Sequence, residues 1–462
     1  MKNPAVTIGS LAVVGVAAAI FLMPIPQGAS PKLFEAGALS VLIVGFWALG
    51  TMPEHIVGLL FFLLAMLFAI APASVVFSGF ASGTLWLVLG GLVTAEAVNV
   101  TRLGERFARF LIGRYMLSYR TLIAATVLVS TALCFVMPAT VSRILLLLPI
   151  MVALAQRLGL APGSRGHDGV ALAVIMTNVQ VGISILPANA PNLVLAGAAE
   201  TLYSTPLIYG EWLLVHFPVM GVLKGLLIIG FIWLLFPDET TARAEAAPAQ
   251  GPMSRAERRL TIILLLALAL WATDFMHRIH PGWIGLAAGL ATLVPIVGVM
   301  PVTVFTERVK FGPFFYIAAI LGLGAVMVHT GLSTALGDGV LENLKLQGGE
   351  DAKNFAILTL LSTFTGVIVT NVAQPALLTP LASHLAEVVG WPLKAVLMTI
   401  VLGCTTVVLP FQTPPAVVGM QIAGLKMRTA LRLTVPLALA SLLVLLPLDY
   451  WWWRALDYFA TR

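Results

Sequence analysis

Long apolar stretches separated by short polar segments dominate this chain. A bilayer core of about 30 Å needs roughly 20 apolar residues in one helix. The pattern predicts eleven full spans, at residues 6–24, 33–49, 55–70, 84–100, 170–186, 215–236, 260–275, 282–299, 311–331, 393–409 and 433–448. The sequence therefore predicts an all-α polytopic membrane protein.

Two more apolar stretches do not fit a single span. Residues 121–156 are too many for one helix and are broken at Met137-Pro138-Ala139-Thr140, and residues 354–388 are broken at Thr370-Asn371. Each half is too short to cross. Irregular backbone at membrane depth is tolerated only inside protein or beside a water-filled cavity. We therefore expect two re-entrant hairpins with polar tips.

The basic residues orient these segments. Hydrophobic residues make up 59% of the 462 positions and charged residues 10%, which excludes a water-soluble surface. If both hairpins return to their own side, one face collects most of the basic residues, namely Arg102, Arg106, Arg109, Arg114, Arg120, Arg157, Arg165, Arg243, Arg255, Arg258, Arg259, Arg308, Lys310, Lys426, Arg428 and Arg432. The positive-inside rule makes this face cytoplasmic. It predicts a bacterial inner-membrane protein with a cytoplasmic N-terminus and a periplasmic C-terminus, and the net charge of +6 needs no nucleic-acid partner.

The chain divides into two similar halves. Phe46-Trp47-Ala48-Leu49 resembles Leu270-Trp271-Ala272-Thr273, and Leu186-Pro187-Ala188-Asn189-Ala190-Pro191-Asn192 resembles Leu409-Pro410-Phe411-Gln412-Thr413-Pro414-Pro415. An odd number of elements between the copies gives them opposite topology, as in many carriers. The expected parts are scaffold helices at 1–118 and 260–350, transport parts at 119–236 and 351–462, and a cytoplasmic linker at 237–259. Each transport part holds a hairpin (121–156, 354–388), a broken helix (170–200, 393–424) and a last helix (215–236, 430–452).

The polar breaks meet at the two hairpin tips and the two broken helices. Helix N-termini at such breaks attract anions, and free carbonyl groups attract cations. Paired catalytic carboxylates, a metal-binding His-Glu motif and a Ser/Lys dyad are not recognisable in the spans, which makes a membrane-embedded enzyme a distant alternative. No spacing among the histidines predicts a metal site, and Cys134 and Cys404 lie in apolar runs that predict inert thiols. The pattern favours a carrier of small anions.

At this point the chain resembles the divalent anion:sodium symporter family of dicarboxylate and citrate carriers. The resemblance covers nearly the whole chain and includes the paired Trp-Ala starts, Phe77-Ser78-Gly79-Phe80-Ala81-Ser82, Thr101-Arg102-Leu103-Gly104 and Thr413-Pro414-Pro415. It implies a homodimer in the lipid, with a static scaffold and a transport part that moves like an elevator. It also implies a substrate site at the tips, for which the matching residues are Thr140, Ser142, Arg143, Asn189, Asn371, Thr413 and Pro414.

The family pattern also implies cation sites, which depart from the usual residues here. The matching positions are Ala139, Thr140, Ala188, Asn189, Val369, Thr370, Asn371 and Gln412. Family members carry Ser-Asn-Thr at each tip, whereas each third position is valine here, at Val141 and Val372. Sodium-coupled relatives place hydroxyl groups one turn before each tip, where this chain has Phe135 and Gly366. These changes favour anion exchange or proton coupling, with no organic cofactor.

Single ionisable residues complete the candidates. A guanidinium near a tip is costly in a membrane unless it faces a cavity or a partner, so Arg143 either contacts substrate or pairs with carbonyl groups. Lys224 favours a structural or interface role, and Glu96 and Asp274 favour structural pairing over proton carriage. The predicted function is secondary transport of di- or tricarboxylates. Sodium-coupled dicarboxylate symport and transport of sulfate or a sulfonate are the alternatives.

Overall fold

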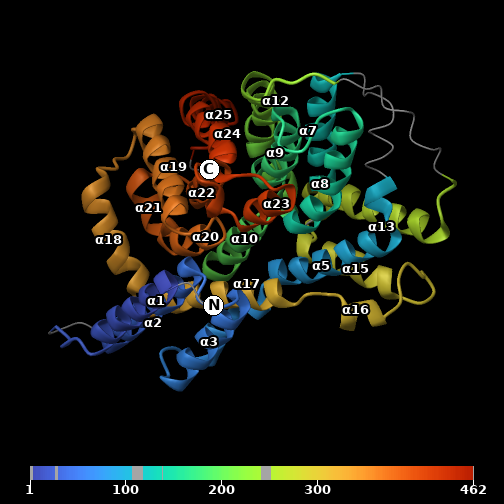
Figure 1. The fold of residues 1–462 in the computed structure, drawn as a ribbon. Coiled ribbons are helices and arrows are strands. Elements are labelled where there is room, and N and C mark those ends of the chain that lie inside the picture. Colours follow the sequence, from blue (N-terminus) through green and yellow to red (C-terminus); the bar gives the residue numbers. More distant parts are fainter. Residues whose placement is uncertain (1–3, 27–29, 107–117, 138, 241–250, 461–462) are drawn as a thin grey trace.

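The helices form two layers in the computed structural model, which describes residues 4–26, 30–106, 118–137, 139–240 and 251–460 (Figure 1). The lower layer holds α1 (Pro4–Phe21), α2 (Pro31–Leu49), α3 (Glu54–Leu67), α4 (Ala73–Val76), α5 (Gly83–Thr101), α13 (Arg255–Ala272), α14 (Asp274–His277), α15 (Pro281–Leu293), α16 (Thr303–Glu307) and α17 (Gly312–His329). Helix α18 (Leu332–Leu344) leads from it to the upper layer. The described residues contain no β-strand, which confirms the all-α prediction.

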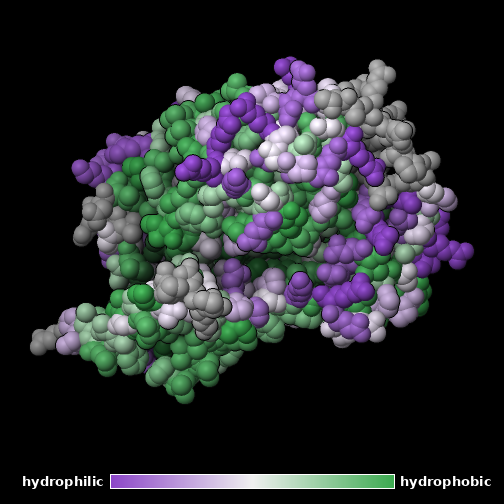
Figure 2. Space-filling view, viewed as in Figure 1, coloured by the Kyte–Doolittle hydropathy of each residue, from purple (hydrophilic) through white to green (hydrophobic). Residues whose placement is uncertain are grey.

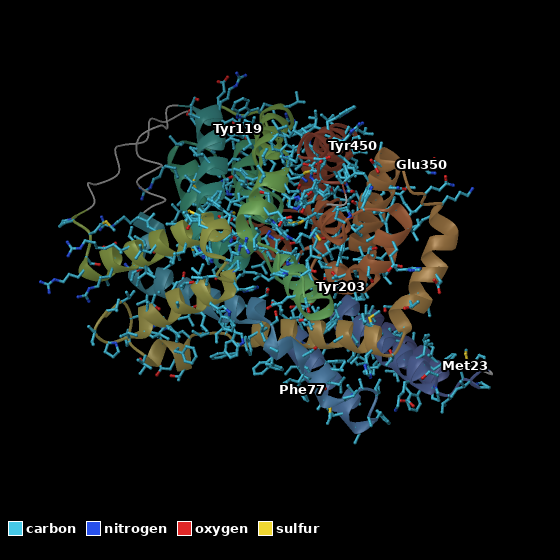
Figure 3. The ribbon with its side chains drawn as sticks, turned by 180° about the vertical axis from the view of Figure 1, so that it is seen from behind. Met23, Phe77, Tyr119, Tyr203, Glu350 and Tyr450 are labelled. Atoms are coloured by element: carbon cyan, nitrogen blue, oxygen red, sulfur yellow. The ribbon has the colours of Figure 1, made fainter. Side chains whose placement is uncertain are left out.

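The upper layer consists of two matching sets of helices. The first set is α7 (Tyr119–Val136), α8 (Thr140–Arg157), α9 (Arg165–Gln180), α10 (Ala190–Tyr203), α11 (Tyr209–His216) and α12 (Lys224–Leu235). The second set is α19 (Asp351–Ile368), α20 (Ala373–Leu378), α21 (Ala382–Val389), α22 (Leu393–Thr405), α23 (Pro414–Ala423), α24 (Met427–Ala440) and α25 (Leu446–Ala455). Figure 3 shows Tyr119 and Tyr450 in this layer and Phe77 in the other, with Tyr203, at the end of α10, between them.

The lower layer is held together by a reciprocal pairing of helices. Helix α5 packs along α15, and α17 packs along α3, so each repeat contributes one member of each pair. The first pair approaches closely, because a Cβ atom on Gly90 would lie 2.2 Å from the carbonyl oxygen of Gly285. The pairing is the one expected if the repeats are related by a pseudo-two-fold axis.

The matching Trp-Ala sequences perform the same local task in each repeat. The indole Nε1 of Trp47 donates to the carbonyl oxygen of Glu54, 3.0 Å away, at the first residue of α3. The indole Nε1 of Trp271 donates to the carbonyl oxygen of Pro281, 3.1 Å away, at the first residue of α15. Each indole therefore ties the end of one long helix to the start of another that follows it, α2 to α3 and α13 to α15.

Both predicted hairpins fold back at their polar breaks. Helices α7 and α8 meet beside Met137 and Ala139, whereas α19 returns through a chain broken into α20, a 3-10 turn at Thr379–Leu381 and α21. The arms of the first hairpin are longer than expected. Each has 18 residues and is long and apolar enough to cross a membrane, so the prediction that each half is too short is wrong for these two arms. Both helices run slightly past the predicted apolar stretch of residues 121–156, because α7 begins directly after its Ser118 cap and α8 ends at Arg157.

Both predicted broken helices are present. Helix α9 ends in 3-10 turns at Val181–Ser184 and Leu186–Ala188 before α10 begins, and α22 ends at Thr405 before a 3-10 turn at Pro410–Gln412 and α23. The amide Nδ2 of Asn192 donates to the carbonyl oxygens of Ile183 and Ile185, 3.0 and 2.9 Å away, which satisfies groups that the break exposes. The predicted spans at 170–186, 282–299 and 393–409 therefore end early as helices, the second because the chain turns after Leu293 at Val294-Pro295.

The described residues include seven helices, counted with their internal π segments, that are long and apolar enough to cross a membrane. Four shorter apolar helices lie at 6–21, 54–67, 281–293 and 393–405. Figure 2 shows apolar residues over the left side and the lower left of the view, and polar residues at the top, on the right and along the seam between the layers. The protein is an all-α polytopic membrane protein. Pro138, Arg109, Arg114 and Arg243 lie outside the described residues.

Candidate substrate cavity

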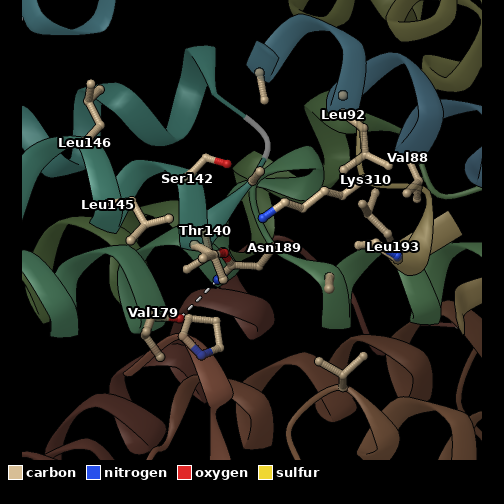
Figure 4. A pocket seen from close by; sticks show the side chains of 18 of the residues that line it. Val88, Leu92, Thr140, Ser142, Leu145, Leu146, Val179, Asn189, Leu193 and Lys310 are labelled. Atoms are coloured by element: carbon tan, nitrogen blue, oxygen red, sulfur yellow. Dashed lines mark hydrogen bonds between the residues drawn. The ribbon is translucent and has the colours of Figure 1, made fainter. Parts of the chain in front are cut away.

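A cavity of about 830 Å³ lies between the two layers. Its floor comes from α5 and α17 of the lower layer, and its roof comes from α8, the breaks before α10 and α23, and the second hairpin tip. The apolar lining includes Val88, Leu92, Leu145, Leu146 and Leu193. Polar groups are few, as expected for a small-molecule site, and come from the tips and breaks, from α5 and from Glu105 and Lys310 (Figure 4).

The cavity brings together six of the candidate residues. They are Ala139, Thr140 and Ser142 from the first tip, Asn189 from the first broken helix, and Asn371 and Thr413 from the second repeat. Val141 and Val372, which occupy the third positions of the tips, also line it. The remaining candidates lie outside the lining, namely Arg143, Ala188, Val369, Thr370, Gln412 and Pro414.

Arg143 lies completely buried behind the first tip, where oxygen atoms surround its guanidinium. Nε donates to Oδ1 of Asn178 at 2.8 Å, and Nη1 donates to the carbonyl oxygens of Ala188, at 2.9 Å, and of Met137. Nη2 donates to Oδ1 of Asn189 at 3.0 Å, to the carbonyl oxygen of Asn178 at 3.3 Å and to the hydroxyl of Thr140 at 3.3 Å. In this geometry the guanidinium contacts two residues that line the cavity, Thr140 and Asn189, but does not line the cavity itself.

Arg143 thereby fixes two lining side chains. Asn189 uses Oδ1 for the guanidinium and for the hydroxyl of Thr140, and its Nδ2 donates to the carbonyl oxygen of Val179 at 3.0 Å. Figure 4 shows Thr140 and Asn189 side by side at the cavity surface. Arg143 therefore orients the lining residues Thr140 and Asn189 through a short hydrogen-bonded network, while its charge stays behind the cavity surface.

The second tip is organised differently. The backbone N–H of Asn371 donates to the carbonyl oxygen of Gln412 at 2.8 Å, and its Nδ2 donates to the carbonyl oxygen of Cys404 at 3.0 Å. Gln412 in turn accepts from the N–H groups of Val408 and Leu409, at 2.8 and 2.6 Å. Within the described residues, Oδ1 of Asn371 and Oε1 of Gln374 are buried without a hydrogen-bond partner.

Three charged side chains line the cavity among the described residues: Glu96, Glu105 and Lys310. Figure 4 shows the Lys310 side chain reaching across the cavity towards Thr140 and Asn189. Asp274 lies elsewhere and caps α11, because its Oδ2 accepts from the N–H of Tyr209 at 2.6 Å. Within the part of the chain that the structure describes, no group of three or more His, Cys, Asp and Glu is placed to hold a metal ion.

Several important residues carry no sequence signal of their own. Asn178 stands within an apolar run, and its side chain contacts only become visible once α9 lies against the first tip. Lys310 belongs to a basic loop, and nothing local distinguishes it from Arg308. Both are found only through packing between segments distant in sequence.

Comparison with known proteins agrees with this architecture. The chain is 26% identical over 391 residues to a "Membrane protein" of Cupriavidus necator, covering 81% of this chain and 76% of the relative. It is 24% identical over 461 residues to the inner membrane protein YbhI of Escherichia coli, covering 95% of both chains. It is 24% identical over 277 residues to the L-tartrate/succinate antiporter of Escherichia coli, covering 56% of this chain and 55% of the relative.

A solved structure shares the fold. The Alcanivorax borkumensis YdaH transporter matches with a TM-score of 0.54 and 17% identity, and the match covers 98% of both chains. The sequence pattern described as the sodium:sulfate symporter transmembrane region matches residues 5–459. The chain therefore belongs to the divalent anion:sodium symporter family of membrane transporters.

Proposed function

We propose that this transporter carries small dicarboxylate anions across the inner membrane by alternating access, by anion exchange or with protons, and that no sodium ion binds at the first tip. The observation that supports this most directly is the oxygen-lined pocket of Arg143. Six oxygen atoms from the tip, α9 and the break before α10 surround one guanidinium.

A sodium ion needs several hard oxygen ligands, of the kind gathered here. The guanidinium of Arg143 already occupies them, and an arginine keeps its charge under all physiological conditions. A covalently attached cation cannot dissociate with each transport cycle. The first repeat therefore has a permanent positive charge where a sodium-coupled carrier would have an exchangeable one.

The cavity suits a small dianion. The start of α10 follows the first break and offers backbone N–H groups there, and the amide and hydroxyl groups of Asn189, Thr140, Asn371 and Thr413 supply polar contacts. Val141 and Val372 replace two hydroxyl groups with apolar contacts, which favours a substrate with a carbon skeleton over sulfate. A relative named as an L-tartrate/succinate antiporter supports the same substrate class and anion exchange.

The division into two layers supports an elevator mechanism in a homodimer. In each subunit the lower layer is static, and the upper layer moves relative to it. In this proposal Lys310, from a loop, and Glu105, from the helical residues just after α5, mark the cytoplasmic opening of the cavity on the strongly basic face. The N-terminus is then cytoplasmic and the C-terminus periplasmic. Cross-linking in native membranes and reporter fusions test the dimer and the orientation.

Sodium coupling at the second tip is the second candidate. Oδ1 of Asn371 and Oε1 of Gln374 are buried without partners in the described residues, and both lie beside Gly366. A Cβ atom on Gly366 would lie 3.3 Å from the former and 2.4 Å from the latter. Two observations favour this candidate. The two amide oxygens could bind a sodium ion, and sodium is the coupling ion in the name of the family.

Counterflow in proteoliposomes tests the proposal. Vesicles are loaded with succinate, tartrate, citrate, sulfate or buffer, and uptake of labelled succinate is followed in sodium and in choline medium. Exchange is expected in vesicles loaded with dicarboxylate, at the same rate in both media. Uptake that requires sodium would favour the second candidate, and no uptake with any anion would contradict dicarboxylate transport.

A further inference from the structure

A second cation lies buried in the upper layer, apart from the cavity. Lys224 opens α12 and Asp449 lies in the first turn of α25, and both side chains are fully buried. These are the last helices of the two repeats. Each follows a π-helical segment, Phe217–Leu223 or Ser441–Leu445, and such segments often lie at functional sites.

The contacts of this pair are incomplete. Nζ of Lys224 donates to the carbonyl oxygen of Thr405, the last residue of α22. Both carboxylate oxygens of Asp449 lack a hydrogen-bond partner among the described residues. The π segment that leads into Lys224 packs against α25, which carries Asp449, and against the π segment that leads into α25, so the two residues lie on adjoining elements. A buried carboxylate whose oxygens accept no hydrogen bond is unusual for a group with a purely structural role.

We propose that Lys224 and Asp449 form a proton-binding site that couples proton movement to anion transport. This inference rests on the transport function proposed above and names its coupling ion. In the empty form the pair holds an ammonium and a carboxylate, with no net charge. One proton from water converts the carboxylate to a carboxylic acid and leaves a net charge of one, and it returns to water on release.

The two repeats would then differ in a defined way. Arg143 supplies a fixed charge behind the first tip, whereas a lysine–aspartate pair can gain and lose a proton. Protonation costs Asp449 no existing hydrogen bond, since both oxygens are free. Buried ionisable groups within membrane spans commonly serve as proton relays.

The pair is connected to the substrate cavity through the end of α22. Thr405 follows Cys404, whose carbonyl oxygen accepts the Nδ2 hydrogen bond of Asn371 at 3.0 Å. Asn371 lines the cavity. A change at Lys224 therefore acts on the carbonyl group of Thr405, the residue after Cys404, whose carbonyl group binds Asn371 of the second tip. This short route gives protonation a mechanical path to the substrate residues.

Few other ionisable groups near Lys224 and Asp449 could bind the transported proton in their place. His216 lies on α11, with its ring centroid 5.8 Å from that of Trp453, one turn beyond Asp449, and its Nε2 contacts the sulfur of Met398. The other described ionisable residues on neighbouring helices lie at helix ends, are thiols or make their own contacts; they are Tyr119, Arg120, Cys134, Arg143, Arg165, His167, Asp168, Tyr209, Glu211, Asp351, Lys353, Lys394, Cys404, Arg428 and Arg432.

The experiment compares wild type with the double variant Lys224→Met, Asp449→Leu. Replacing a buried pair by apolar residues of similar size often preserves folding, whereas removing one partner does not. Uptake of labelled succinate into unloaded vesicles is measured with an inward proton gradient, with pyranine inside to record proton entry. Counterflow into succinate-loaded vesicles is measured in parallel. A gradient of one pH unit can drive about tenfold accumulation per proton carried.

Wild type is expected to take up succinate with the gradient and to acidify the vesicles as it does so. The double variant is expected to keep counterflow but to lose the response to the gradient and the substrate-linked acidification. Wild type that exchanges anions without proton entry would overturn the inference, whether or not the variant folds. A folded variant that still follows the gradient would overturn it too, whereas absence of all transport by wild type would contradict the proposed function instead.

The chain offers a matched control. Lys394 and Glu211 form an ion pair of 2.8 Å between the start of α22 and α11, and both are partly exposed. The double variant Lys394→Met, Glu211→Gln removes a lysine–acid pair from the same neighbourhood. Its response to the proton gradient is expected to equal that of wild type, and an equal loss in this control would overturn the assignment to Lys224 and Asp449.

Discussion

Glu200, near the end of α10, accepts a hydrogen bond of 2.6 Å from the hydroxyl of Ser82, the residue that caps α5. The same carboxylate accepts from the N–H groups of Gly83 and Thr84, at 2.9 and 3.2 Å. One acidic side chain of the upper layer thus satisfies the free N–H groups at the start of a helix of the lower layer.

Replacing Glu200 by alanine is therefore expected to destabilise the protein. The loss leaves donors unpaired at the start of α5, and charge-assisted hydrogen bonds of this kind contribute about 1.5–3 kcal/mol each. Thermal unfolding in detergent should show a lower Tm. Glu350→Ala is the control, since Glu350 pairs with Lys353 on the surface and should contribute little. Equal Tm values for both variants would contradict the capping role.

Arg143→Ala is expected to abolish sodium-independent uptake, because it leaves six oxygens without their cation. If those oxygens form a sodium-like site, sodium should partly restore uptake in the variant, whereas uptake by wild type is expected to be independent of sodium. Uptake by purified variant in sodium and choline media measures this. Arg120→Ala, which removes an exposed arginine from the start of α7, is the control. Wild-type uptake by Arg143→Ala in choline would show that the guanidinium is dispensable.

Thr140→Ala and Asn371→Ala are expected to weaken substrate binding, since both side chains reach the cavity. Loss of one hydrogen bond to a carboxylate raises the half-saturating concentration about tenfold. Initial rates of counterflow against succinate concentration provide the test. Thr365→Ala, which loses only a bond to the carbonyl oxygen of Leu361, is the control. Unchanged kinetics in both tip variants would place the substrate elsewhere.

Lys310→Gln is expected to raise the substrate requirement severalfold, because this lysine is the cation that lines the cavity among the described residues. The effect should shrink at high salt, since the side chain is exposed and its field is screened. Kinetics at low and high ionic strength check this prediction. Arg308→Gln removes an exposed charge two residues away that does not line the cavity. A similar change in that variant would indicate a general surface effect.

Gly90→Ala is expected to destabilise the lower layer, since its Cβ would lie 2.2 Å from the carbonyl oxygen of Gly285. Overpacking of this kind costs about 1–3 kcal/mol. Gly230→Ala is the matched control in another helix, because nothing lies within 4 Å of its Cβ position. Tm values should fall for the first variant and stay level or rise for the second. A stable Gly90→Ala variant would mean that α5 and α15 can separate.

The sequence alone determined the all-α membrane fold and its two hairpins and two broken helices. Apolar stretches of spanning length leave no other solution in lipid, and Pro and polar residues mark the breaks because they interrupt helical hydrogen bonding. The paired Trp-Ala starts also predicted the repeat, and Trp47 and Trp271 make equivalent bonds. Local chemistry repeated along the chain is visible without a structure.

Only the tertiary structure decided what the charged side chains do. Arg143 meets oxygens from Asn178, Ala188 and Asn189, and Lys224 meets Thr405, which lies far away in sequence. The sequence left Arg143 between substrate contact and carbonyl pairing, and packing placed it behind the tip. A buried charge is defined by the groups that surround it, and those groups come together only when distant helices pack.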